Sequence, residues 1–140
     1  MLALWGCATL SSTKEQYVVC SYDSAFEAAS EAVKDRSIVK QDKVSGVIET
    51  AWLEIPMPGR KFGAFRREIA EGRDRSRIFV EVKRLKDVIQ IGFYEEREAW
   101  AFRGGSRMFG WSPTDPSPEV QHDFEVRLDA KLKEQGCHTS

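Results

Sequence analysis

Two apolar runs separated by a charged turn constrain the fold of this chain more than any other feature. They are Ile78-Phe79-Val80-Glu81-Val82 and Val88-Ile89-Gln90-Ile91-Gly92-Phe93-Tyr94, with Lys86-Asp87 in the turn between them. β-Branched and aromatic residues dominate both runs, which is typical of strands. The two runs therefore predict a pair of adjacent antiparallel strands.

Strand-like segments also precede this pair. Gln16 to Ser21 predicts one strand, and Ser37 to Gln41 with Gly46 to Ile55 predicts a β-hairpin. The stretch between the two arms of the hairpin, residues 42–46, is rich in turn-forming residues and reverses the chain. Pro56-Met57-Pro58-Gly59 ends the second arm.

Two segments have the spacing of helices. In the first, Ser24 and Glu27 match a capping box, and the helix is expected to continue to about Arg36. Its apolar face consists of Phe26, Ala29 and Val33. The second is expected to start with Ser117 as N-cap and Pro118 at the first helical position. Its apolar residues are Val120, Phe124, Leu128 and Leu132, and Gly136 marks its end.

Two further segments resist a simple assignment. Residues 60–75 fit a helix, from the spacing of Phe62, Phe65 and Ile69, or an irregular strand. Phe102 to Ser117 is rich in Gly, Ser and Pro and predicts a loop whose aromatic residues pack back on the sheet.

The order of these elements predicts an α+β fold. We expect an antiparallel β-meander with two helices packed on one face, in the order β-α-β-β-β-β-α. The length of 140 residues and the hydrophobic content of 41% suit one globular domain. We assign this domain to residues 16–136, followed by a tail at 137–140.

The N-terminal tetrapeptide Leu4-Trp5-Gly6-Cys7 resembles the lipobox of bacterial lipoproteins. That resemblance implies a partial signal peptide at residues 1–6, an acylated Cys7, and a tether at 7–15 that holds the domain on the periplasmic side of the outer membrane. The stretch before Cys7 has no Lys or Arg and is shorter than an h-region of about 7 to 15 residues. Either the start lies further upstream, or the match is accidental and Cys7 is an ordinary thiol.

The membrane connection expected here is an anchor and not a span. No run of about 18 apolar residues occurs in the sequence, so a transmembrane helix is not expected.

Three cysteines make an odd number, which in a secreted protein gives one thiol a separate fate. Acylation of Cys7 would leave Cys20 and Cys137 as a possible disulfide pair in an oxidising compartment. Alternatively, Cys20 is a small buried hydrophobic residue in its strand.

The predicted layout, together with Gly46-Val47-Ile48 in the hairpin, resembles the small domains of BamC-type lipoproteins of the β-barrel assembly machinery. The similarity covers residues 16–135. Such domains are binding or scaffolding modules, so the resemblance implies interaction and not catalysis.

Chemical motifs are sparse in this chain. Neither His122 nor His138 has metal-ligand spacing to cysteines or carboxylates, so we expect no metal site and no cofactor. Arg103-Gly104-Gly105-Ser106-Arg107 superficially resembles an anion-binding loop but lacks the spacing and lysine of a P-loop, which favours a simple turn. No nucleophilic triad can be assembled, and we expect that the protein is not an enzyme.

A basic stretch with interleaved aromatic residues is the candidate binding surface. Residues 60–107 hold 13 Lys or Arg against 8 Asp or Glu. The candidate residues are Arg60, Lys61, Arg66, Arg67, Arg73, Arg75, Arg77, Arg103 and Arg107. Such a surface suits lipid headgroups, peptidoglycan carboxylates, an acidic partner or a nucleic-acid backbone. Because Glu68, Glu71 and Asp74 dilute it, a solvated face of ion pairs is the competing interpretation.

Two functional hypotheses follow. The favoured one is a non-enzymatic envelope lipoprotein that binds a protein or peptidoglycan through the basic and aromatic surface. The alternative is a cytosolic nucleic-acid-binding domain that uses the Arg-rich segment 60–77. A pI near 6.2 argues against the alternative, since such domains are usually strongly basic. A third possibility is an enzyme with a small-ligand cavity between helix and sheet, but no particular residue in the sequence supports it.

Overall fold

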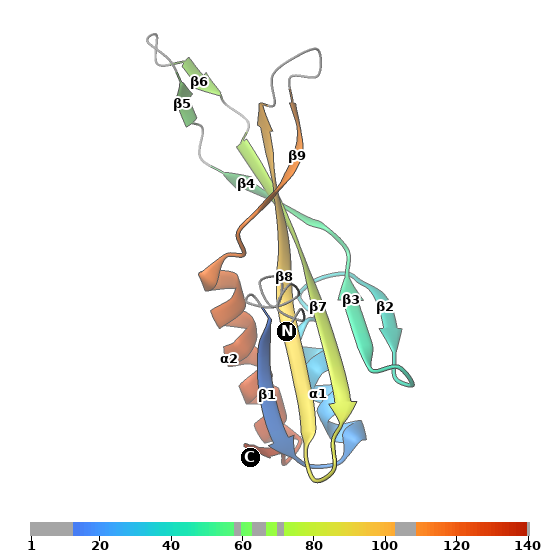
Figure 1. Cartoon of the computed structure of the whole chain (residues 1–140). Helices are drawn as coiled ribbons and strands as arrows, with labels where there is room; N and C mark the ends of the chain where they lie inside the picture. Colours follow the sequence, from blue (N-terminus) through green and yellow to red (C-terminus); the bar gives the residue numbers. More distant parts are fainter. Residues whose placement is uncertain (1–12, 58–59, 63–66, 70–71, 103–108, 140) are drawn as a thin grey trace, which may run out of the picture.

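Two long antiparallel strands, β7 (Gly72–Arg84) and β8 (Ile89–Phe102), run the length of the molecule in the computed structural model (Figure 1). The structure describes residues 13–57, 60–62, 67–69, 72–102 and 109–139. The two strands pair in register from Arg73 opposite Trp100 to Arg84 opposite Ile89. The antiparallel pair expected from the two apolar runs is therefore present, but both strands are much longer than those runs.

The remaining strands add to both sides of this central ribbon. The full order is β10-β1-β8-β7-β3-β2, while β4 pairs with β7 and β9 pairs with β8 at the other end of the ribbon. The bounds are β1 (Lys14–Val19), β2 (Ile38–Asp42), β3 (Val47–Thr50), β4 (Leu53–Met57), β9 (Phe109–Thr114) and β10 (His138–Thr139). The fold is α+β with an antiparallel sheet, as the sequence predicts, and it has more strands than expected.

The second arm of the expected hairpin is divided into β3 and β4. Both pair with β7: β3 pairs with it around Val80, and β4 pairs with the stretch from Ser76 back to Gly72. At the break, the hydroxyl of Thr50 accepts a hydrogen bond from the Ile78 amide at 2.9 Å, so a side chain replaces a backbone acceptor. The turn before β3 follows the prediction, and Gly46 adopts a positive φ of 78° there.

Strand β9 corrects the expected loop between Phe102 and Ser117. Its glycine, serine and proline residues are turn formers, but β9 lies at the edge of the sheet, where a proline costs no ladder hydrogen bond. Trp111 lies opposite Trp100 on β8, so this aromatic residue does pack on the sheet. Strands β5 (Arg60–Phe62) and β6 (Arg67–Ile69) pair with each other, which resolves part of the unassigned segment as a small hairpin.

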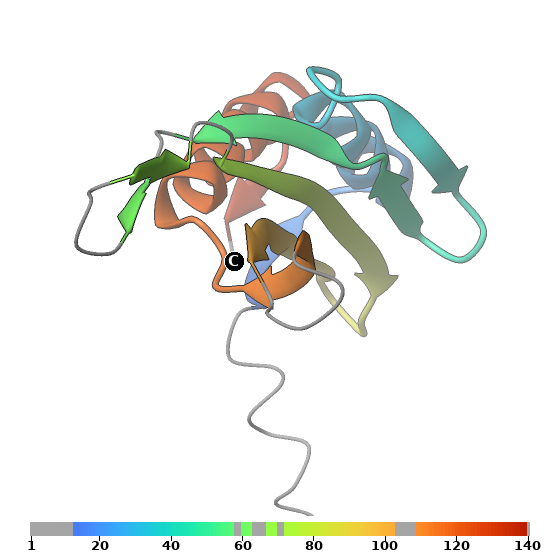
Figure 2. The same ribbon diagram turned by 90° about the horizontal axis from the view of Figure 1, so that it is seen from above.

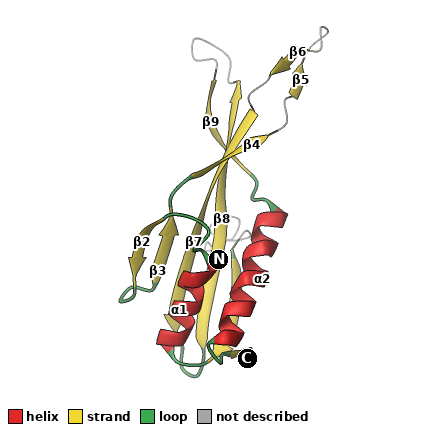
Figure 3. Ribbon diagram, turned by 180° about the vertical axis from the view of Figure 1, so that it is seen from behind, coloured by secondary structure: helices red, strands yellow, loops and turns green. Residues whose placement is uncertain are grey.

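Both helices cover one face of the sheet, as predicted (Figures 2 and 3). Helix α2 (Pro118–Glu134) has the expected N-cap, because the Ser117 hydroxyl accepts from the Val120 amide. Helix α1 (Tyr22–Ala32) begins earlier than expected, because Ser21 and not Ser24 is the N-cap. It also ends at Ala32 and not at Arg36. Among the helices described, none is long and apolar enough to cross a membrane.

The core lies between the helices and the half of the β7–β8 ribbon next to the turn that joins the two strands. Helix α1 contributes a face of small residues, which lets the two helices pack closely. At the centre, the rings of Phe93 and Phe124 pack at 4.6 Å between centroids. The largest fully buried side chains are Phe93, Phe124, Ile48, Ile78, Ile91 and Leu128.

The C-terminal segment is part of the fold and not a tail. Gly136 has a φ of 78°, which turns the chain after α2. Cys137 then forms a disulfide with Cys20, with 4.9 Å between the two Cα atoms. His138 and Thr139 pair with the end of β1. The structure therefore has the disulfide that the sequence left open, and the domain extends beyond residue 136. It also begins before residue 16, since β1 starts at Lys14.

Candidate functional site

The face of the sheet opposite the helices carries the candidate binding residues. Side chains alternate between the two faces of a strand, so residues two apart in β7 share a face. Arg73, Arg75, Arg77 and Phe79 therefore point away from the helices, while Asp74, Ser76, Ile78 and Val80 are buried. We call the face opposite the helices the outer face. The end of the segment 60–75, which the sequence left unassigned, is thus part of a regular strand with arginines on one side.

The three outer-face arginines of β7, Arg73, Arg75 and Arg77, form a continuous row with four aromatic residues, which we call the Arg-aromatic row. The Arg75 guanidinium lies 4.4 Å from the ring centroids of both Trp52 and Trp111. Arg77 lies 4.5 Å from Trp52 and 5.1 Å from Phe79. Arg73 lies 5.3 Å from Trp100 at the other end of the row. Arginine is suited to these positions because its planar cation stacks on aromatic faces.

Carboxylates pair with the same three arginines. Arg73 bonds Glu54 at 3.0 Å, and the Nε of Arg75 donates to Glu98 at 2.8 Å. Arg77 contacts Glu96 at 2.6 Å and Glu49 at 3.6 Å. Three positive charges are therefore matched by four negative ones. For these residues the structure favours the face of ion pairs over an open basic patch.

The other candidates are not brought into this row. Arg60 and Lys61 lie on β5 and Arg67 on β6, where Lys61 is opposite Glu68 in the register. Figure 1 shows this hairpin projecting beyond the end of the ribbon. Arg66, Arg103, Arg107, Phe65 and the lipidation candidate Cys7 lie outside the described residues.

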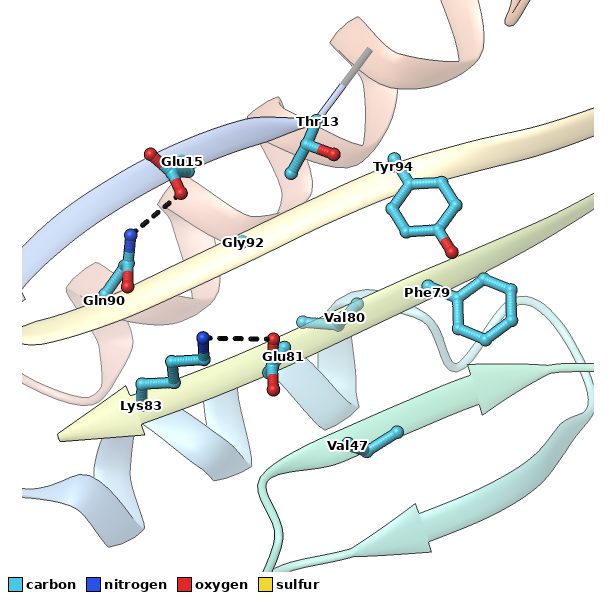
Figure 4. Close-up of a pocket in the computed structure, with 10 residues that line it drawn as sticks. All are labelled: Thr13, Glu15, Val47, Phe79, Val80, Glu81, Lys83, Gln90, Gly92 and Tyr94. Carbon is cyan, nitrogen blue, oxygen red and sulfur yellow. Dashed lines mark hydrogen bonds and ion pairs between the residues drawn. The ribbon is translucent and has the colours of Figure 1, made fainter. Parts of the chain in front are cut away.

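A groove of about 410 Å³ lies on the outer face next to the Arg-aromatic row (Figure 4). It exists because Gly92 has no side chain in the middle of β8. The register places Glu15, Gly92, Glu81 and Val47 in one line across β1, β8, β7 and β3. A carboxylate therefore stands on each side of the gap above the glycine.

Aromatic and polar side chains close the two ends of the groove. At one end the rings of Phe79 and Tyr94 stack with 5.1 Å between centroids. At the other end the Gln90 amide donates to Glu15 at 2.9 Å, and Lys83 pairs with Glu81 at 3.6 Å (Figure 4). The charged groups of the groove are exposed, so their pairing is weak and exchangeable.

On the opposite, inner face, a buried polar cluster lies where the ribbon leaves the helices. Arg97 donates to Asp74 and to Glu95, each at 2.8 Å. Glu95 also accepts from the hydroxyl of Ser76 and, at 2.6 Å, from the backbone amide of Ser117. Ser76 in turn accepts from Arg36 at 2.9 Å. We call these residues the inner polar cluster.

The inner polar cluster holds several elements together. Glu95 is 3% exposed and Ser76 is fully buried, so these contacts are shielded from water. Glu95 binds the amide of the α2 N-cap residue, as the glutamate of a capping box does, although it comes from a strand. Arg36 follows α1, so the cluster ties both helices to β7 and β8.

The pKa values of two groups follow from these surroundings. Burial opposes the charge on Arg97, but hydrogen bonds and charges from Asp74 and Glu95 outweigh it, and the pKa of Arg97 is raised. Burial also raises the pKa of Tyr94 in the groove wall, and the charge of Glu96 raises it further. Both shifts keep these residues in the protonation state they have at neutral pH.

The part of the chain that the structure describes has no group of three or more His, Cys, Asp or Glu side chains that could hold a metal ion. His122 is exposed on α2, and His138 is on β10 at the opposite edge of the sheet from β2. Comparison with known protein families and with curated protein sequences finds no match for this chain. Inferences about function therefore rest on the geometry of the outer face.

Sequence reasoning missed the aromatic and acidic partners of the arginines. A signal was present in the period of two shared by Arg73, Arg75 and Arg77, and in the same period of Glu96, Glu98 and Trp100. Trp52 and Trp111 carried no such signal, since Trp52 lies at the break between β3 and β4 and Trp111 lies in β9, and the sequence predicted neither the break nor that strand.

Proposed function

We propose that this chain is a non-enzymatic binding module of a bacterial envelope, anchored to the outer membrane through an acylated Cys7, and that it contacts a protein or envelope polymer through its outer face. The observation that carries the proposal is that both helices cover the inner face, while the outer face presents a built row of aromatic and charged groups beside a groove. Aromatic residues and arginines are enriched at protein interfaces.

The disulfide supports the envelope location. A bond between Cys20 and Cys137 closes most of the chain into one loop and forms in oxidising compartments such as the periplasm. With these two residues paired, Cys7 has no cysteine partner within the chain, which is consistent with a separate fate for its thiol.

The pairing of Arg73, Arg75 and Arg77 with carboxylates weakens the nucleic-acid alternative. Binding to a nucleic-acid backbone depends on cations that replace condensed counterions. On the outer face these three cations already have anionic neighbours, so little net positive charge is available for a phosphate backbone.

The anchor and the contact face are tested separately in bacterial cells. For the anchor, we expect palmitate labelling and globomycin-sensitive processing that disappear in Cys7→Ala. Unlabelled protein that fractionates away from membranes would refute the anchor.

For the contact face, a photo-crosslinking residue is placed at Gln90, on the outer face, or at Asp129, an exposed position on α2. We expect discrete crosslinked adducts from position 90 and not from position 129. Equal adducts from both positions, or none from position 90, would refute the outer face as the contact surface. Crosslinks to nucleic acid would support the alternative function instead.

A further inference from the structure

The groove above Gly92 lies between two carboxylates on the outer face. Glu15 and Glu81 flank the glycine in the same line across the sheet, two strand spacings apart, or about 10 Å between backbones. Two exposed carboxylates would ordinarily be a solvated pair on a sheet. Here the missing side chain at position 92 leaves room between them for a ligand group.

The charge balance of the groove selects the sign of that group. Gln90 and Tyr17, which are both neutral, donate hydrogen bonds to Glu15, so the negative charge of Glu15 is not cancelled. Glu81 pairs with Lys83 at 3.6 Å, and both side chains are about half exposed, so this contact is weak. Two carboxylates against one amine leave the groove acidic, which is complementary to a cation.

The walls of the groove suit the rest of a long cationic side chain. Phe79 and Tyr94 provide stacked rings at one end, and Val47 provides an apolar surface at the end of the line. The aliphatic stem of a lysine or arginine packs well on such surfaces while its charged end meets carboxylates. A neutral sugar would use the same hydroxyl, amide and carboxylate groups but would leave the excess negative charge unmatched.

We infer that this groove takes a lysine or arginine side chain from an extended segment of a partner protein, with the cation between Glu15 and Glu81. This inference rests on the proposed function, since it specifies the partner that contacts the outer face. It also gives Lys83 a defined role as the intramolecular cation that the ligand displaces.

The test uses the disulfide-bonded 140-residue chain labelled with ¹⁵N and a blocked tetralysine peptide as the probe. Amide shifts of Gly92, Gln90 and Glu81 are followed during titration, and the same peptide with acetylated lysines is the uncharged control. We expect shifts confined to the groove with the charged peptide only, and apparent affinity that falls as salt is added.

Three substitutions make the test specific. Glu15→Gln and Glu81→Gln are expected to weaken binding about fivefold each, the effect of one exposed ion pair. Lys83→Gln is expected to strengthen binding by a similar factor, because it removes the competing cation. Lys14→Gln, outside the groove lining, is the control for Lys83→Gln. If Lys14→Gln strengthened binding as much as Lys83→Gln does, the peptide would be attracted to the chain non-specifically and not to the groove.

Occupancy of the gap is tested at Gly92 itself. A Cβ built at this position would be 3.9 Å from its nearest atoms, so Gly92→Ala is accommodated and serves as the control for Gly92→Phe. We expect Gly92→Phe to abolish the shifts while Gly92→Ala retains most of the binding. Unchanged binding in Glu15→Gln and Glu81→Gln, or shifts produced by chitotriose and not by the peptide, would overturn the inference. Neither result would affect palmitate labelling or crosslinking from the outer face, which test the proposed function separately.

Discussion

At the scale of single residues, the inner polar cluster is the most demanding part of the fold. Glu95 is buried beside the N-terminus of α2, the side chain of Arg97 is 9% exposed, and each has several partners. Charged groups removed from water need such compensation, because the desolvation cost of an unpaired ion exceeds the gain from most contacts. A single change in this cluster is therefore expected to cost much more than a change on the outer face.

Glu95 and its neighbour Glu96 allow a direct comparison. Glu95→Ala removes one of the two carboxylates that Arg97 contacts and also the acceptor of the Ser117 amide, so we expect the free energy of unfolding to fall by about 3 to 5 kcal/mol. Glu96→Ala removes a partly exposed ion pair with Arg77 and should cost about 1 kcal/mol or less. Urea unfolding followed by circular dichroism measures both. Equal losses in the two variants would contradict a special role for the cluster.

Tyr94 gives a prediction about pH. Its pKa is raised by burial and by Glu96, so the folded state keeps the phenol neutral to higher pH than the unfolded chain does. This contribution to stability is fully present below the unfolded pKa of about 10 and is lost as the pH rises through the folded pKa. Tyrosinate absorbance of the native protein minus that of Tyr94→Phe should titrate above pH of about 10. A difference curve centred at or below that pH would refute the shift.

At the scale of elements, the Arg-aromatic row adds side-chain contacts between strands that also pair through their backbones. Trp52 lies just before β4, and Trp111 is in β9, while the arginine between them belongs to β7. Neither helix reaches this end of the ribbon (Figure 1). The row therefore takes the place of a hydrophobic core at the end of the sheet that the helices do not cover.

The stacking of Arg75 is tested by reciprocal substitutions on one strand. Arg75→Lys keeps the charge but loses the planar group between two indoles, and we expect a loss of about 1 kcal/mol in unfolding free energy. Lys83→Arg, on the same face of β7, is the matched control and should change stability by about 0.5 kcal/mol or less. An Arg75→Lys variant as stable as the control would show that the row is an ordinary set of ion pairs.

The elements that the sequence predicts well are those with local signals. Helix α2 depends on Ser117, Pro118 and a regular apolar spacing, all within the segment itself. The extensions of β7 and β8 were missed because Asp74 and Glu95 occupy inner positions, which breaks the apolar alternation. Strand β9 was missed because it depends on pairing with β8, and no property of its own six residues indicates this. The outer face was predicted only as a basic segment, since ion pairs between strands depend on register.

At the scale of the whole molecule, a disulfide links the two ends of the domain. The disulfide joins the end of β1 to the segment after α2, across a sequence separation of 117 residues. Crosslinks that close long loops restrict the unfolded chain most strongly. The first and last elements of the domain are thus held together.

Removal of this link is expected to reduce stability substantially. For Cys20→Ser combined with Cys137→Ser, we expect the free energy of unfolding to fall by about 4 to 5 kcal/mol. Cys7→Ser is the control and should leave both stability and the disulfide unchanged. Thermal unfolding with and without a reducing agent measures the effect. A reducing agent that lowers the melting temperature of the double variant as much as that of the parent would contradict this explanation.

The direction of β1 determines how an anchored molecule would be oriented. β1 is antiparallel to β8 and begins at Lys14, opposite Phe93, so the chain enters from the side to which β8 extends. From Phe93 to Phe102, β8 advances about 30 Å further, whereas the stretch from Cys7 to Lys14 spans at most about 25 Å. A molecule held at Cys7 in the way we propose would therefore have the far end of its ribbon at the membrane surface, with its long axis tilted and the helices furthest from the lipid.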